Sequence, residues 1–111
     1  MNDTNYVGGI VKILETPKQK FFNKNIAVTK FRAQLPQVRN TRIVSLTFWG
    51  NLATDVASYY KTNDYILVEG YLSIRDKQTL NSNIKKLKKV EITVLKVYPF
   101  LLNYNRSINK I

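Results

Sequence analysis

Apolar and polar residues alternate with a period of two along most of this chain, and clusters of Gly, Pro and Asn separate the alternating runs. A period of two places successive side chains on opposite faces, so the pattern predicts half-buried β-strands. The clearest run is Arg42 to Trp49. Its core face consists of Val44, Leu46 and Phe48, which puts Trp49 on the outer face.

Apolar residues return at helical spacing directly after Gly50. Leu52, Val56 and Tyr60 share one face of a helix predicted over about Leu52 to Lys61, and Asn51 is the expected N-cap. These three side chains are typical of packing beneath a sheet rather than of chemistry. The sequence therefore predicts one short helix inside an otherwise β-rich chain.

The strands are five in number: Tyr6–Leu14, Ile26–Leu35, Arg42–Trp49, Tyr65–Arg75 and Val90–Tyr98. Gly8-Gly9 lies inside the first strand, where such a pair marks a bulge or a close backbone approach, and Glu69-Gly70 marks a bulge in the fourth strand. Five strands, with the helix between the third and fourth, predict an all-β, five-stranded OB-fold Greek-key barrel.

The remaining segments are predicted to be loops and a tail. Pro17 to Asn25 is a basic loop, and Asp76 to Lys89 is a long, basic hairpin loop. Residues 1–99 form one OB-fold domain, and residues 100–111 form a basic C-terminal tail, partly mobile at the chain end.

The charge of the chain indicates a polyanionic partner. Eighteen Lys and Arg against seven Asp and Glu give 111 residues a formal charge of +11. The chain contains no Cys and no His, which removes disulfides, thiol nucleophiles, His-based acid/base pairs and common Cys/His zinc sites. We expect no enzymatic activity, no cofactor and no metal.

No apolar run approaches the roughly 18 to 20 residues of a membrane span, and the N-terminus lacks a signal or transit pattern. We therefore expect no membrane partner and a protein that works where it is made. The chain is rich in Lys, Asn, Ile and Tyr, whose codons are AT-rich. This bias is typical of an organelle, a phage or a reduced bacterium.

Two stretches carry a family resemblance: Val44 to Ala53, VSLTFWGNLA, and Tyr59 to Leu72, YYKTNDYILVEGYL. Their order and spacing resemble the single-stranded DNA-binding protein family of bacteria and organelles. In that family an aromatic-Gly-x-Leu-Ala turn precedes the helix, and a Glu-Gly-x-Leu strand follows it. The resemblance covers about residues 5 to 98, including Gly9, Pro17 and the last strand.

The resemblance implies an OB barrel, a homotetramer, and coating of single-stranded DNA in replication, recombination and repair. With the AT-rich composition it implies a plastid, as for members encoded in algal plastid genomes, or otherwise a bacterial cytoplasm. The stacking aromatics of the family fall at Ile43, Trp49 and Lys77, of which only Trp49 is aromatic. Because the chain ends in a basic segment, recruitment through an acidic tail is not expected.

The candidate nucleic-acid-binding residues are aromatic rings for base stacking and cations for phosphates. Trp49 is a stacking ring or a cover over the barrel end, and each cation has a solvated role as its alternative. Tyr71 and Arg75 share an outer strand face. The full set is Lys30, Arg32, Arg42, Trp49, Tyr71, Arg75, Lys77, Lys85, Lys86, Lys88 and Lys89.

The function that these residues favour is binding of single-stranded DNA without strong sequence preference. One alternative is an accessory or assembly subunit of a replication complex with weak DNA or RNA binding, suggested by the replacements at Ile43 and Lys77. A role on structured RNA is a further alternative, because composition does not reveal a 2′-OH preference.

Overall fold

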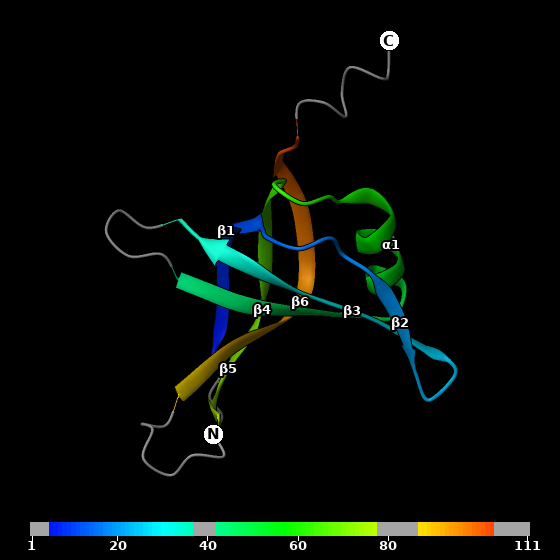
Figure 1. Ribbon diagram of the computed structural model, residues 1–111, viewed down its shortest axis with the longest axis horizontal. Helices are drawn as coiled ribbons and strands as arrows, with labels where there is room; N and C mark the ends of the chain where they lie inside the picture. Colours follow the sequence, from blue (N-terminus) through cyan, green and yellow to red (C-terminus); the bar gives the residue numbers. More distant parts are fainter. Residues whose placement is uncertain (1–4, 37–41, 78–86, 104–111) are drawn as a thin grey trace.

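The computed structural model describes residues 5–36, 42–77 and 87–103, without the side chains of 75–77, 87 and 88. It contains six strands and one helix (Figure 1). In chain order these are β1 (Tyr6–Ile13), β2 (Gln19–Phe22), β3 (Ile26–Leu35), β4 (Arg42–Trp49), α1 (Asn51–Tyr59), β5 (Tyr65–Lys77) and β6 (Leu87–Leu101).

The sheet closes on itself. Its strand order is β1-β5-β6-β4-β3-β2, and β1 pairs a second time, with β3, through Lys12 with Gln34 and Ile13 with Ala33. The β4–β6 pair is parallel and the other pairs are antiparallel. Five strands thus form a ring and β2 is attached outside it, which confirms the predicted all-β, OB-fold class with its helix between β4 and β5.

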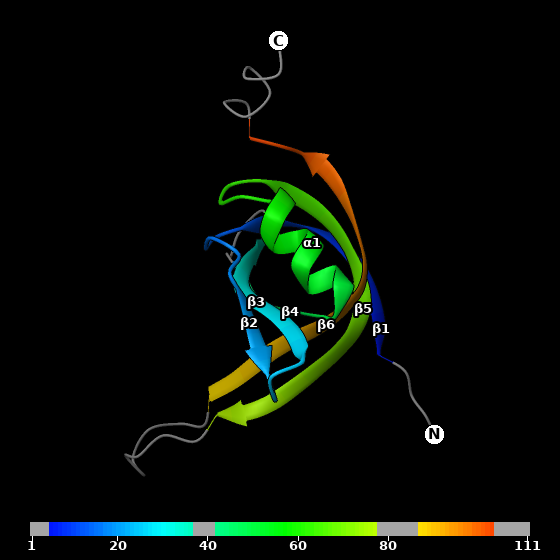
Figure 2. The same cartoon turned by 90° about the vertical axis from the view of Figure 1, so that its right-hand side faces the viewer.

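The inner faces of the strands form the core, and Leu46 and Phe48 are fully buried. The ring of Phe48 stacks on that of Phe31, with centroids 5.3 Å apart. Helix α1 lies across one opening of the barrel (Figure 2) and buries Ala53 and Val56 there. Apolar alternation of the strands therefore fills the barrel, and the helix closes one end, as its spacing predicts.

The predicted bulge at Glu69-Gly70 is confirmed. Glu69 pairs with Lys96 and Gly70 with Val94, so Leu95 on β6 has no partner in the ladder. A Cβ at position 70 would collide with the carbonyl oxygen of Thr93, which is why this strand needs glycine there.

Of the two roles predicted for Gly8-Gly9, the bulge is wrong, and the close backbone approach is found at Gly8, where an added Cβ would lie 3.6 Å from the Val68 carbonyl oxygen. The register of β1 with β5 is continuous from Tyr6–Tyr71 to Lys12–Tyr65. Gly8 instead lies beside β5, where an added Cβ would be 3.4 Å from the side chain of Glu69. Glycine here marks a close neighbour rather than an extra residue.

The predicted basic loop from Pro17 to Asn25 is wrong in part, because it contains β2. Strand β2 pairs with β3 from Gln19–Thr29 to Phe22–Ile26. The turn between them places Asn23 and Lys24 at positive φ, 53° and 69°, the left-handed conformation that tight hairpins use. The segment lacks a period-two pattern, since β2 lies outside the ring.

Four further boundaries differ from the prediction. The N-cap of α1 is Gly50, at φ 67°, rather than Asn51, which is the first helical residue. Strands β5 and β6 extend into the predicted Asp76–Lys89 loop, of which residues 78–86 lie outside the described part. Strand β6 also continues to Leu101, two residues into the predicted tail.

Candidate nucleic-acid interface

The outer face of β2, β3 and β4 is organised by strand register. Lys20 lies opposite Val28, and Val28 lies opposite Trp49 on its other side. Two residues further along β3, Lys30 lies opposite Thr47. Because side chains alternate across a strand, Lys20, Lys30 and Trp49 all project from one side of the sheet.

Trp49 meets a second aromatic ring on this face. The rings of Phe22 and Trp49 are edge to face, with centroids 6.0 Å apart. Trp49 is 42% exposed and Phe22 is 52% exposed, so both rings pack against each other and still present apolar surface. The predicted outward position of Trp49 is confirmed. Phe22 was not predicted as a binding residue, because it falls in the segment predicted as a loop. Two adjacent phenylalanines next to Lys18 and Lys20 are the sequence signal that could have identified it.

Tyr71 belongs to a different aromatic pair. Its ring meets Tyr6 edge to face at 5.4 Å between centroids, and the Tyr6 hydroxyl donates to Glu69 Oε1 at 3.1 Å. Partial loss of hydration, followed by this hydrogen bond, raises the pKa of Tyr6. Register connects Tyr71 to Thr93 and Thr93 to Thr47, so β6 separates this pair from Trp49.

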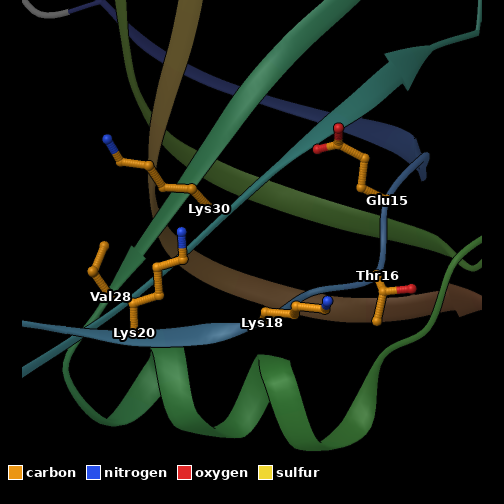
Figure 3. A pocket seen from close by; sticks show the side chains of 6 residues that line it. All are labelled: Glu15, Thr16, Lys18, Lys20, Val28 and Lys30. Carbon is orange, nitrogen blue, oxygen red and sulfur yellow. The ribbon is translucent and has the colours of Figure 1, made fainter.

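Lys30 lines a pocket of about 450 Å³ on the outside of the barrel. The pocket is formed by β2, β3 and the segment after β1 (Figure 3). Two further lysines, Lys18 and Lys20, line it; sequence reasoning missed both with β2. Glu15, Thr16 and Val28 complete the lining.

Arg32 is engaged with Glu15. Its Nε donates to Glu15 Oε2 at 2.7 Å and its backbone N–H donates to Oε1 at 2.8 Å. The backbone hydrogen bond, and then the side-chain bond, lowers the pKa of Glu15. Glu15 is therefore ionised at neutral pH, and Arg32 balances its charge.

The other predicted cations are placed differently. Arg42 has the parity of the core residue Val44 and lines an apolar pocket of about 730 Å³ with Leu35 and Leu72, away from Trp49. Lys89 forms an ion pair with Glu91 at 3.3 Å. Arg75, Lys77 and Lys88 lie in strands, but their side chains are not described. Lys85 and Lys86 lie outside the described residues. Lys88 and Lys89 belong to β6 rather than to a loop.

The described residues contain no group of three His, Cys, Asp or Glu side chains placed to hold a metal ion. Among those same residues, no helix has the length and apolar character needed to cross a membrane.

A closed OB-type barrel that presents aromatic rings and lysines on one outer face is the architecture of a single-strand-binding protein. A protein of Trieres chinensis named "Putative single-stranded DNA-binding protein ycf41" is 47% identical over 103 residues, which cover 89% of this chain and 91% of the relative. The chain therefore belongs to this single-stranded DNA-binding protein family. No family model matches the sequence.

Solved structures share the fold at lower identity. The small single-stranded DNA-binding protein of Streptomyces coelicolor superimposes with a TM-score of 0.74 at 16% identity, covering 96% of this chain and 99% of that chain. The SSB domain of a Synechococcus sp. protein gives 0.69 at 22% identity, covering 88% and 98%. The second single-stranded DNA-binding protein of Mycobacterium smegmatis gives 0.67 at 24%, covering 87% and 89%.

Proposed function

We propose that this chain binds single-stranded DNA, without strong sequence preference, on the outer face of β2, β3 and β4. The observation that carries the proposal is the half-exposed Phe22–Trp49 pair beside Lys20 and Lys30. The similarity to a relative whose name describes single-stranded DNA binding supports the same conclusion.

The two kinds of side chain make complementary contributions. Stacking of a base on an aromatic ring is worth about 1 to 3 kcal/mol and tolerates any base, since every base has a π-face. Lysine neutralises phosphate charge and releases counterions, which makes binding weaken as salt rises. Together they give sequence-tolerant and salt-dependent binding.

The biological setting is also part of the proposal. We place the protein in DNA replication, repair and recombination, in the plastid of an alga, and as a homotetramer. Support comes from the algal relative, from the AT-rich composition and from the family resemblance. Residues 1–99 serve as the binding domain, and the basic segment 100–111 adds positive charge.

The direct test is a titration of intrinsic fluorescence with oligo-dT at low and high salt. Trp49 is the single tryptophan, so its emission reports on the proposed site alone. Quenching that weakens as salt rises supports the proposal. No quenching and no spectral shift at low salt contradicts it.

Two companion measurements test the details. A titration with oligo-U of the same length compares RNA with DNA. Tighter binding of oligo-U than of oligo-dT would show that RNA, rather than DNA, is the ligand. Light scattering of the purified chain measures the oligomeric state, and a monomer at micromolar concentration would remove the tetramer.

A further inference from the structure

Three lysines line the pocket between β2 and β3, and only Lys30 among them was a predicted binding residue. Lys18, Lys20 and Lys30 line one pocket of about 450 Å³, and in Figure 3 the side chain of Lys20 rises from β2 toward the strand that carries Lys30. Three lysines and one glutamate line the pocket, so its lining carries a net positive charge, which attracts an anion. The pocket therefore has the charge of an anion site.

The acidic wall of the pocket does not cancel this charge. Glu15 is the acidic lining residue, and both of its oxygens accept hydrogen bonds from Arg32. Within the described part of the chain, none of the three pocket lysines takes part in an ion pair. The positive charge of the lysines thus remains available to a ligand.

The pocket also adjoins the aromatic pair. Val28 lines the pocket and lies between Lys20 and Trp49 in the register of three strands. Neighbouring strands are about 4.8 Å apart, so the backbones at Lys20 and Trp49 are separated by about 10 Å. A nucleotide whose base stacks on Trp49 and Phe22 thus has its backbone close to the pocket.

We propose that the pocket of Lys18, Lys20 and Lys30 binds one backbone phosphate of a nucleic-acid strand, next to the base stacked on Phe22 and Trp49. This inference rests on the proposed function and deepens it: it assigns a defined anion site to β2, the strand attached outside the ring. Arg32 pairs with both oxygens of Glu15, so this carboxylate is engaged at the wall of the pocket rather than with the lysines.

The test compares two triple variants that remove the same charge. Lys18→Gln, Lys20→Gln and Lys30→Gln are combined in one chain. Lys12→Gln, Lys61→Gln and Lys96→Gln are combined in the other, because none of these three lysines lines the pocket. Affinity for a short oligo-dT is measured by anisotropy over a range of salt concentrations.

For the pocket variant, loss of one phosphate contact lowers the slope of log K against log salt by about 0.7, beyond any change in the control variant. The same slope corresponds to an affinity loss of about fivefold at about 0.1 M salt, which disappears near 1 M. An oligomer of abasic sites should show the same loss, since the contact is to phosphate and not to a base.

Each other outcome has a definite meaning. Equal slopes for the two triple variants overturn the pocket while leaving DNA binding intact. A slope change near 2 means that three separate phosphates are bound, which overturns the single-phosphate site. If the unmodified chain fails to bind oligo-dT, the proposed function fails, and the phosphate site fails with it.

Discussion

Two pairs of aromatic rings lie on the outside of this barrel, and they differ in the charge around them. Phe22 and Trp49 lie beside Lys20 and Lys30. In the other pair the Tyr6 hydroxyl bonds to the carboxylate of Glu69, which lies opposite Lys96 in the ladder. Exposure does not separate the pairs, because Trp49 is 42% and Tyr71 is 49% exposed. The neighbours decide: a carboxylate repels phosphate, and lysines attract it.

The largest expected effect comes from breaking this comparison at one ring of each pair. Trp49→Ala removes a stacking platform and should weaken oligo-dT binding by about 1 to 3 kcal/mol, or about 5- to 150-fold. Tyr71→Ala should leave affinity nearly unchanged. Anisotropy of end-labelled oligo-dT measures both, and circular dichroism checks that each variant folds. Equal losses in the two variants would contradict the distinction between the pairs.

The second aromatic pair lies next to Gly70 of β5, whose structural role can be tested by measuring the free energy of unfolding. Gly70→Ala places a Cβ against the Thr93 carbonyl and 2.9 Å from Val94 Cα. Overpacking of this kind costs about 1 to 3 kcal/mol of unfolding free energy, measured by urea denaturation.

Gly9→Ala is the matched control for Gly70→Ala. No atom lies within 4 Å of a Cβ built at Gly9, and its backbone lies in a regular stretch of β1. The substitution should change the unfolding free energy by no more than about 0.5 kcal/mol. A similar loss at both positions would show that close approach at the bulge is not the cause.

A smaller effect is expected where α1 is attached to β3, next to the Phe22–Trp49 region. The buried Thr29 hydroxyl donates to the carbonyl of Ala53 at 2.8 Å. Thr29→Val keeps the shape and leaves that carbonyl without its donor, which should cost about 0.5 to 1.5 kcal/mol. Thr54→Val on the exposed side of α1 is the control, and an equal loss there would remove the hydrogen bond as the explanation.

Local pattern predicted the ring of the barrel well, for a physical reason. The alternation of Val44, Leu46 and Phe48 against Trp49 reports which face is buried, and burial is what drives folding. Glycine in a strand is costly unless the backbone requires it, which predicted the bulge at Gly70, but the same rule fails at Gly9, which lies in a regular stretch with open space around it. The helix was found from its 3.6-residue period.

The missed features depend on contacts between distant residues or on strands outside the core. Strand β2 has few buried side chains, so its sequence shows no apolar alternation. The exposed Phe22 lies in this strand and was therefore not predicted either. Arg42, a candidate phosphate contact, has the parity of the core residue Val44 and lines an apolar pocket with Leu35 and Leu72. The pairing of Arg32 with Glu15 joins residues 17 positions apart, which strand register alone brings together.

The smallest expected effect sharpens the charge argument, because it changes stability and binding in opposite directions. Above the ordinary pKa of a glutamate, 4.5, Glu15 is ionised in both states and its pairing with Arg32 stabilises the fold. Because folding lowers the pKa of Glu15, this stabilisation disappears as pH falls through the lowered value. Glu15→Gln should therefore cost less than about 1 kcal/mol at pH 7, as exposed ion pairs do, and nothing in strong acid, by urea denaturation at each pH. The same variant leaves the charge of Arg32 without its balancing carboxylate beside the pocket, so oligo-dT affinity at pH 7 should rise by up to about fivefold. A fall in affinity would mean that the wall geometry, rather than its charge, controls the pocket.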